Sequence, residues 1–239
     1  MASALARAFA SFVVPPLCVC CREPELSGSA VCPRCERLLV SLPDPRCRTC
    51  GGPVGRECVR CGECRGRSLA FDRAWSGFAY EGAARHLVAA LKSRGALSAA
   101  GFMGARTAGG APGSLLCGPL VPVPAHTRRR QRHGFNQAAV LARAIGRVTG
   151  QPVAEVLRRD GGSRRQVGLE RDARLANAPG AVSMRARAAR RRPSIEPFVV
   201  LVDDVYTTGA TLDACARALR GAGAREVVAL TFARAVRTC

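Results

Sequence analysis

The stretch Val199–Thr211 reads VVLVDDVYTTGAT, and it predicts both the fold class and the main binding site. Its first four residues are valine or leucine, which is typical of a strand buried on both faces of a parallel sheet. Asp203 and Asp204 follow at the carboxyl end of that strand, where α/β proteins bind their ligands. The segment Thr207–Thr211 then forms a turn that begins a helix. We therefore expect a ligand site between a central strand and a helix.

The residue types in this turn favour a sugar phosphate as the ligand. Hydroxyls and backbone N–H groups at a helix N-terminus bind a phosphate dianion, and Gly209 lets the backbone approach it closely. Two adjacent carboxylates repel phosphate, so Asp203 and Asp204 suit ribose hydroxyls, either directly or through Mg²⁺. A ligand with a phosphate and free ribose hydroxyls is therefore expected. The alternative is an ordinary strand–helix connection in which Asp and Thr act only as caps.

The sequence around this stretch predicts an α/β domain with a parallel sheet and right-handed crossovers. Helical and strand patterns of apolar residues alternate along this part of the chain. We expect helices over residues 82–92, 97–108, 136–149 and 212–222, and strands over residues 119–123, 153–157, 198–202 and 227–232. Residues 160–178 are predicted to form a polar loop.

Ten of the 13 cysteines lie before residue 65 and form a repeat. A Cys-x2-Cys pair is followed after ten residues by a second pair, and this arrangement occurs twice. Each pair aims two thiolates at one ion, so two pairs complete a tetrahedral zinc site. The predicted ligands of two structural Zn²⁺ ions are Cys18, Cys21, Cys32 and Cys35 for the first, and Cys47, Cys50, Cys61 and Cys64 for the second.

The second zinc site has an alternative set of ligands, because Cys58 and Cys61 also form a Cys-x2-Cys pair; the repeat favours Cys64. Neither a histidine nor a carboxylate offers the open position of a catalytic zinc. Zinc would instead fold a segment too small to bury its own core, and a zinc ribbon can also dock nucleic acid or protein. We expect a double zinc-ribbon module over residues 1–66 and an α/β domain over residues 67–239.

The chain is strongly basic. Lys and Arg number 37 against 17 Asp and Glu, which gives a net charge of +20, and Lys92 is the single lysine. Such a charge attracts polyanions, and the arginine runs at Arg128–Arg130 and Arg185–Arg192 suit a nucleic-acid backbone such as single-stranded DNA. Aromatic residues make up only 5% of the chain, which gives little support for base stacking. A solvated basic surface is the alternative.

The same composition favours a protein of the cytoplasm. The apolar runs are shorter than the ~18 residues that a membrane span needs. Met1–Val14 is predicted to be a short amphipathic helix rather than a signal sequence. Cysteines in a chain without a secretory signal favour metal binding over disulfides.

Val199–Thr211 resembles the motif with which type I phosphoribosyltransferases bind 5-phosphoribosyl-1-pyrophosphate (PRPP). The resemblance implies that Asp203 and Asp204 bind the ribose hydroxyls and that Mg²⁺ accompanies PRPP. It implies that the 5′-phosphate is bound by Thr207, Thr208, Gly209, Ala210 and Thr211. Tyr206 is bulkier than expected in such a turn, and we interpret it as a residue that lines the pocket.

Other motifs resemble the ComF family, which joins N-terminal cysteine pairs to a phosphoribosyltransferase-like domain and includes proteins of DNA uptake in natural transformation. They are VPVP at Val121–Pro124, RHGFNQ at Arg132–Gln137, and a later pattern of Gln166, Leu169, Arg174 and Asn177. His133 departs from the arginine that the family usually has before Gly-Phe-Asn-Gln.

The resemblance also implies a site for the leaving pyrophosphate. Val123 and Pro124 would form one loop of it, Lys92 is a further candidate, and a flap over residues 164–177 would contribute Arg164 and Arg174. A variable hood over residues 71–110 would recognise the acceptor.

Three functions stay open at this point. The first is transfer of a phosphoribosyl group from PRPP to an unknown acceptor. The second is a non-catalytic accessory protein of DNA uptake that binds PRPP or a nucleotide together with DNA and DNA-uptake proteins. The third is a zinc-ribbon adaptor with a vestigial domain.

Overall fold

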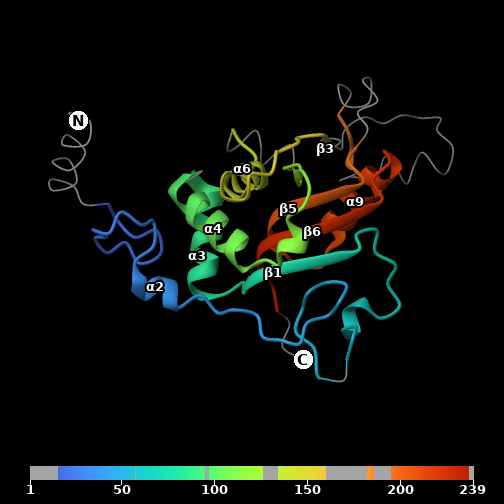
Figure 1. Ribbon diagram of the computed structural model, residues 1–239. Coiled ribbons are helices and arrows are strands. Elements are labelled where there is room, and N and C mark those ends of the chain that lie inside the picture. Colours follow the sequence, from blue (N-terminus) through green and yellow to red (C-terminus); the bar gives the residue numbers. More distant parts are fainter. Residues whose placement is uncertain are drawn as a thin grey trace, which may run out of the picture.

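The computed structural model describes residues 16–56, 58–94, 97–125, 134–159, 182–185 and 195–236. Within these residues the chain forms a parallel sheet covered by helices on both faces (Figure 1). The sheet has four strands in the order β1-β6-β5-β2, and all of its pairs are parallel. Its strands are β1 (Arg73–Ala79), β2 (Leu120–Pro122), β5 (Phe198–Tyr206) and β6 (Glu226–Arg234).

Two short strands form a separate antiparallel pair, β3 (Leu157–Arg159) and β4 (Val182–Met184). The helices are α2 (Pro33–Arg37), α3 (Gly82–Arg94), α4 (Leu97–Gly110), α6 (Gln137–Thr149) and α9 (Ala210–Gly221), with single 3₁₀ turns at Gly62–Cys64 and Gly113–Leu115. Helix α6 has well-formed ends: the Asn136 side chain accepts a hydrogen bond from the N–H of Ala138, and Gly150 follows the last turn in the left-handed conformation.

Strand β5 is buried on both faces, as its apolar run predicts. Val200 and Val202 belong to the core that the sheet forms with α3, α4 and α6. Val199 and Leu201 belong to the core on the opposite face, which includes α9. Because successive side chains of a strand point to opposite faces, one run of valine and leucine supplies both cores.

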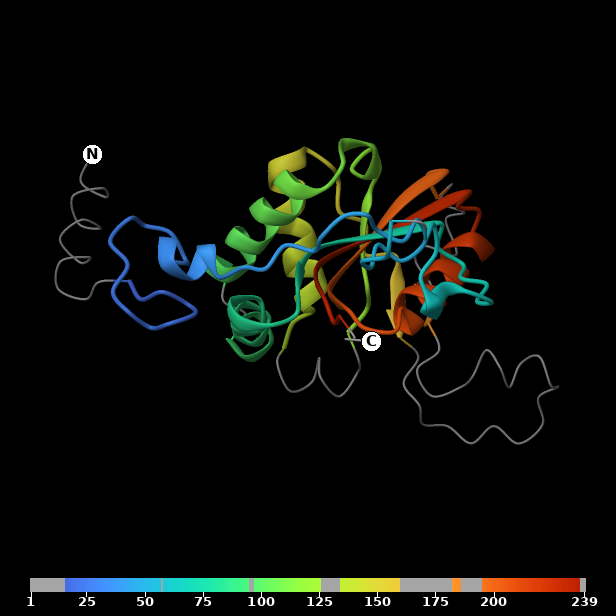
Figure 2. The same ribbon diagram turned by 90° about the horizontal axis from the view of Figure 1, so that it is seen from below.

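The two cysteine-rich segments pack on opposite faces of this sheet. Cys18 and Cys35 are buried in the core of α3 and α4, whereas Cys47, Cys50 and Cys64 are buried in the core of α9. Figures 1 and 2 show the first segment, in blue, beside α3 and α4, and the second, in cyan, under β1 and towards α9. The chain before β1 therefore wraps around the edge of the sheet. The predicted module boundary near residue 66 stays a prediction.

The four expected helices and the strands expected at 119–123, 198–202 and 227–232 are confirmed, with shifted ends. Strand β5 continues through both aspartates to Tyr206, and Val153 forms only a bridge to Leu120 ahead of β3. Strand β1 was not predicted, because Ser76 and Gly77 interrupt its apolar pattern. Ser76 is nevertheless fully buried, and its hydroxyl lies 2.7 Å from that of Thr231 on β6.

Two other expectations concern the chain ends and the polar loop. The helix expected at Met1–Val14 and the loop at 160–178 lie outside the described residues. None of the helices within the described ranges is both long and apolar enough to cross a membrane.

Candidate functional site

A pocket of about 410 Å³ lies where β2 and β5 end. These strands are paired in parallel, so their carboxyl ends meet at one edge of the sheet. The pocket is lined by Val123, Pro124, Ala125, Asn136, Gln137, Ala138, Arg159, Asp203, Asp204 and Thr211. The structure thus brings together three groups of predicted residues: the end of β2, the acidic pair and the start of α9.

The acidic pair is held in a defined arrangement. Asp203 accepts a hydrogen bond from the N–H of Asp204 at 2.9 Å, and Lys92 Nζ lies 2.9 Å from Asp204 Oδ2. Burial, together with the charge of Asp204, raises the pKa of Asp203 to about 7, although the N–H of Asp204, Lys92 and Arg159 act in the opposite direction. Asp203 therefore exchanges a proton near neutral pH, and its ionised form accepts hydrogen bonds from hydroxyls.

The turn after β5 is shaped by Gly209. This residue has φ 77° and directly precedes α9, so it takes a conformation that disfavours other residues. Thr208 supports the turn from both sides: its hydroxyl accepts the N–H of Ala210 at 3.4 Å, and its carbonyl accepts Arg67 Nη1 at 3.1 Å. Thr211, in the first turn of α9, lines the pocket. The pocket therefore borders the N-terminus of a 12-residue helix, where an anion is favoured.

The interpretation of Tyr206 as a pocket residue was wrong. Its side chain is buried beneath the turn, and its ring meets the edge of Phe71 with 6.4 Å between centroids. Arg234 belongs to β6, and its guanidinium lies 4.2 Å from the centroid of the Tyr206 ring. A Cβ on Gly209 would come within 2.5 Å of the Tyr206 hydroxyl oxygen. Tyr206 therefore packs beneath the turn and supports it, and its hydroxyl leaves no room for a side chain at position 209.

The segment after β2 is tied to both the sheet and α6. Val123 donates its N–H to the carbonyl of Val202 at 2.9 Å and accepts Asn136 Nδ2 at 3.0 Å. Val123 and Pro124 both line the pocket, while Lys92 reaches it through Asp204. Binding of pyrophosphate by these residues stays a prediction.

The other predicted site residues are placed less fully. Thr207, Thr208, Gly209 and Ala210 form the turn next to Thr211 but do not line the pocket themselves. Arg164 and Arg174, with the expected flap, lie outside the described residues.

Sequence reasoning missed three polar residues of the pocket, Asn136, Gln137 and Arg159. Asn136 and Gln137 lie in the motif RHGFNQ, which signalled the family but had been given no role. Arg159 lies at the end of β3, and it is the tertiary structure, without any local sequence signal, that places it in the pocket. The side chain of Gln137 is buried, and its Nε2 lacks a hydrogen-bond partner among the described residues.

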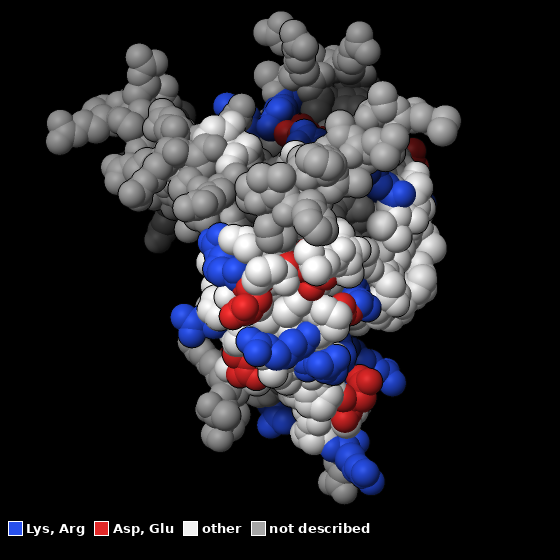
Figure 3. Space-filling view, turned by 90° about the vertical axis from the view of Figure 1, so that its left-hand side faces the viewer, with Lys and Arg blue, Asp and Glu red and all other residues white. Residues whose placement is uncertain are grey.

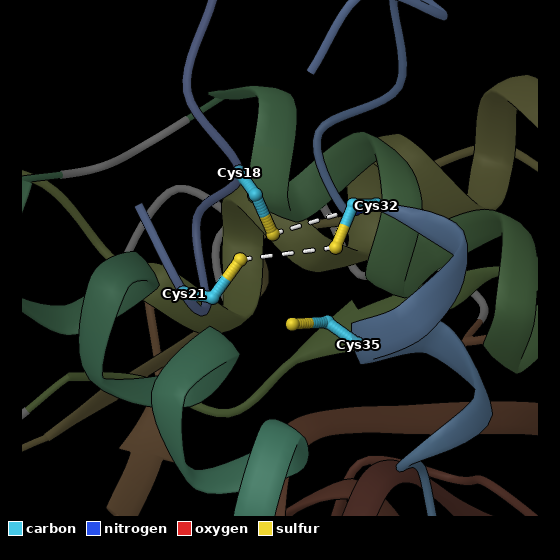
Figure 4. Close-up of side chains that lie close together, drawn as sticks. All are labelled: Cys18, Cys21, Cys32 and Cys35. Carbon is cyan, nitrogen blue, oxygen red and sulfur yellow. Dashed lines mark hydrogen bonds between the residues drawn. The ribbon is translucent and has the colours of Figure 1, made fainter. Parts of the chain in front are cut away.

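The first four cysteines form a compact group of sulfurs. The Sγ atoms of Cys18, Cys21, Cys32 and Cys35 all lie within 4.8 Å of one another and point towards a common centre (Figure 4). The Cys21 and Cys32 sulfurs are 3.8 Å apart. Four sulfurs placed about 2.3 Å from a tetrahedral zinc would be separated by about 3.8 Å. The group could therefore hold Zn²⁺ with little rearrangement.

Backbone donors prepare this group for a cation. The N–H of Cys32 points at Cys18 Sγ at 3.3 Å. Burial acts to raise the pKa of Cys18, but the N–H groups of Cys21, Cys32 and Cys20 outweigh it and lower the pKa to about 6. A thiolate is the form that binds zinc.

The second group consists of Cys47, Cys50, Cys61 and Cys64, whose Sγ atoms also lie within 4.8 Å of one another. The sulfurs of Cys50 and Cys61 are 3.5 Å apart. Cys64 is buried in this group, whereas Cys58 is exposed and lies outside it. The structure therefore selects Cys64 over Cys58, as the repeat favoured.

The second group also contacts the residues that support the turn Thr207–Thr211. Arg234 is only 4% exposed, and its guanidinium donates to the carbonyl of Cys50 at 2.8 Å and to Cys50 Sγ at 3.3 Å. The same guanidinium covers the ring of Tyr206. A single buried cation therefore touches both the cysteine group and the residue that supports Gly209.

The surface charge is mixed where it can be seen. Figure 3 shows basic side chains lying beside acidic ones on the face that it presents. Arg128–Arg130 and residues 186–192 lie outside the described residues. Arg185 is described, and it donates to the carbonyl of Leu157 at 3.0 Å.

These features define the class of protein. A parallel sheet flanked by helices, with its pocket at the carboxyl edge and two four-cysteine groups ahead of it, is a phosphoribosyltransferase-like α/β fold preceded by a pair of zinc ribbons.

Comparison with known proteins gives the family. The chain is 31% identical over 228 residues to the DNA utilization protein YhgH of Salmonella typhi, covering 90% of this chain and 95% of that protein. It is 26% identical over 226 residues to Competence protein F of Haemophilus influenzae, covering 91% and 96%. Competence protein ComFC of Bacillus subtilis is 29% identical over 116 residues, which is 48% of this chain and 44% of that one. The chain belongs to the ComF family. No protein-family model matches it.

Proposed function

We propose that this protein binds PRPP in the pocket at the ends of β2 and β5. The observation that carries the proposal is the meeting of Asp203, Asp204 and Thr211 in one pocket, beside a turn that Gly209 shapes. The carboxylates suit the ribose hydroxyls, and the start of α9 suits the 5′-phosphate. PRPP carries both a 5′-phosphate and free ribose hydroxyls, so each part of the pocket has a matching group on the ligand.

The donor set of the pocket also fits the divalent cation that accompanies PRPP. Asp203 and Asp204 are hard oxygen ligands of the kind that Mg²⁺ prefers, and bound Mg²⁺ would supply positive charge beside the pyrophosphate. Lys92 and Arg159 supply further positive charge at the same edge of the sheet. These cations favour the loss of pyrophosphate from C1 of the ribose.

Phosphoribosyl transfer is the reaction that such a pocket supports. A nitrogen of the acceptor would form a bond to C1, the bond from C1 to pyrophosphate would break, and the nitrogen would release its proton. Pyrophosphate would take the electron pair of the broken bond, and the proton of the nitrogen would pass to solvent or to an oxygen of the departing pyrophosphate.

The proposal is tested by replacing both carboxylates, Asp203→Asn together with Asp204→Asn. We expect PRPP binding in the presence of Mg²⁺ to weaken by at least about 100-fold, because two charge-assisted contacts to the ligand are lost. Isothermal calorimetry measures the affinity. Turnover of PRPP against a panel of nitrogen bases, measured on the same samples, separates an enzyme from a binding protein.

The matched control is Glu81→Gln together with Glu196→Gln, which removes two carboxylates from exposed positions. Its affinity for PRPP should match that of the unaltered protein. Equal loss in both variants, with the fold intact by circular dichroism, would show that the acidic pair has no specific role.

DNA binding is a second candidate function, and the net charge of +20 supports it. The names of the relatives YhgH and Competence protein F refer to DNA utilization and competence. We propose on this basis an accessory role in DNA uptake with DNA-uptake proteins as partners. Zinc ligation needs reduced thiols, which favours the cytoplasm as the compartment.

For this second function, the salt dependence of binding to single-stranded DNA is the decisive measurement. A surface that neutralises about five phosphates would lose roughly 100-fold in affinity between 50 and 200 mM salt. Replacing Arg128–Arg130 with glutamine should lower the slope of log affinity against log salt by about two. If the protein shows no binding at the lowest salt, the DNA function is excluded.

A further inference from the structure

The two four-cysteine groups differ in what they contact, although their spacing is the same. The first packs against α3 and α4, where Cys20 donates to the carbonyl of Ala83. Ala83 lies about 13 Å along α3 from Lys92, which forms an ion pair in the pocket. The second packs in the core that contains Tyr206, which supports the turn Thr207–Thr211. The two groups are thus placed differently relative to the proposed ligand site.

Arg234 joins the second group to the underside of this turn. Its guanidinium donates to the carbonyl and the sulfur of Cys50, and it lies over the ring of Tyr206. The hydroxyl of Tyr206 in turn packs beneath Gly209. All four residues are buried, so a displacement of Cys50 would be passed on through closely packed atoms.

The chain that leaves the second group makes two further contacts near the turn. Arg67, just after Cys64, donates from Nη1 to the carbonyl of Thr208 at 3.1 Å. Ala70 donates its N–H to Oδ1 of Asp213, in the first turn of α9, at 2.7 Å. The second cysteine segment is therefore bonded both to the ligand turn and to the helix that follows it.

A metal ion would fix the positions from which these contacts start. Zn²⁺ held by the four sulfurs would cross-link the Cys-x2-Cys pair that includes Cys50 to the pair that includes Cys64. Without the ion this link is lost, and a small zinc-binding segment draws much of its folding free energy from its metal. Cys50 would then no longer be a fixed acceptor. A buried guanidinium without acceptors is costly, so Arg234 and the Tyr206 ring that it covers would shift.

We propose that metal binding by the second cysteine group sets the affinity of the turn Thr207–Thr211 for a sugar phosphate, and that metal binding by the first group does not. This inference rests on the proposed binding of PRPP. The coupling is reciprocal, because a ligand that binds the ordered turn must strengthen retention of the metal by the same factor. The second zinc ribbon is thus a metal-dependent regulator of the pocket.

The first experiment compares Cys61→Ser with Cys32→Ser in the full chain. Each is the third cysteine of its group and each is partly buried, so the two variants lose equivalent ligands. Calorimetry with PRPP and Mg²⁺ measures the affinity. We expect PRPP to bind about 10-fold more weakly to Cys61→Ser and within 2-fold of normal to Cys32→Ser. Inorganic pyrophosphate, which lacks the 5′-phosphate, should bind both variants equally.

The second experiment measures zinc retention and does not depend on the folding of a variant. Zinc is transferred from the unaltered protein to the colorimetric chelator pyridylazoresorcinol, with and without saturating ribose 5-phosphate. We expect the ligand to slow release of one of the two ions by about 10-fold. Cys32→Ser, which keeps the second group, should show the same slowing.

A third comparison tests one contact without removing a zinc ligand. Arg67→Gln removes the donor to the Thr208 carbonyl, while Arg65→Gln removes an equal charge from an exposed position in the same segment. Ribose 5-phosphate should bind about 5-fold more weakly to Arg67→Gln and within 2-fold of normal to Arg65→Gln. Equal weakening in both variants would assign the effect to net charge and contradict a role of the contact.

The remaining outcomes separate the coupling from the proposed function. Normal PRPP binding by the unaltered protein, with equal affinities in Cys61→Ser and Cys32→Ser, rejects the coupling alone. Release of both ions or of neither ion slowed by ribose 5-phosphate also rejects it, and this result decides if Cys61→Ser does not fold. Failure of the unaltered protein to bind PRPP rejects the proposed function, and the coupling falls with it.

Discussion

Replacing Cys64 with serine is expected to lower the zinc content from two ions to one and the melting temperature by about 10 °C. Cys64 is 1% exposed and packs in the core that contains Phe71 and Tyr206. Loss of one thiolate leaves an incomplete site, and zinc binding supplies folding free energy. A loss of about 4 kcal/mol shifts the melting temperature of a chain of this size by roughly 10 °C. Metal analysis and a thermal melt measure both effects.

Cys58→Ser is the matched control for this prediction. Cys58 is exposed and outside the group of four sulfurs, so two zinc ions and the normal melting temperature should be retained. If Cys58→Ser loses an ion and Cys64→Ser does not, the assignment of the second site is reversed. Two ions in both variants would show that neither cysteine is needed.

Gly209→Ala is expected to weaken PRPP binding by about 10-fold to 100-fold. The new Cβ would lie 2.5 Å from the hydroxyl oxygen of Tyr206 and 2.9 Å from its Cζ, both too close. The ring cannot move aside easily, because it is buried between Phe71 and Arg234. The positive φ adds about 1–2 kcal/mol of strain. The turn must therefore shift, and the phosphate cradle shifts with it.

The control for this prediction separates strain from collision. Gly223 also has a positive φ, at 110°, but an added Cβ there would meet nothing within 4 Å. Gly223→Ala should cost stability through strain alone and leave PRPP affinity unchanged. Calorimetry at equal folded fractions measures both variants. Normal affinity in Gly209→Ala would mean that the turn does not contact the ligand.

The features that were predicted correctly depend on residues that lie close together in the sequence. The apolar run of Val199–Val202 identifies a buried strand from the local sequence alone. A strand that is covered on both faces is apolar at every position, and both faces of this strand are covered. The cysteine spacing likewise predicts each ligand set, because a tight turn brings two thiolates together. The structure confirms the buried strand, and it brings each predicted set of four cysteines together in a group that could hold a metal ion.

The parts that were missed depend on contacts distant in sequence. Strand β1 contains a buried Ser76, which is stable there only because Thr231 faces it across the sheet. Tyr206 was placed on the wrong side of its turn, since the pocket for its ring is built by Phe71 and Arg234. The family resemblance named Lys92 as a candidate site residue, but its ion pair with Asp204 was not predicted, because the two residues lie on different elements.

The position of Arg234 also means that the cysteine-rich segment cannot be removed from the C-terminal part of the chain without loss of contacts. Its guanidinium is shielded by the Cys50 loop, and Gly52 packs so closely that an added Cβ would lie 2.9 Å from Arg234 Nε. A fragment that starts at residue 67 would leave this guanidinium without the Cys50 carbonyl and sulfur that accept its hydrogen bonds, and would uncover the apolar residues beneath the turn at Gly209. The second cysteine segment thus supports the residues beneath the pocket. Ligand affinities measured on the isolated C-terminal part would therefore describe an altered site.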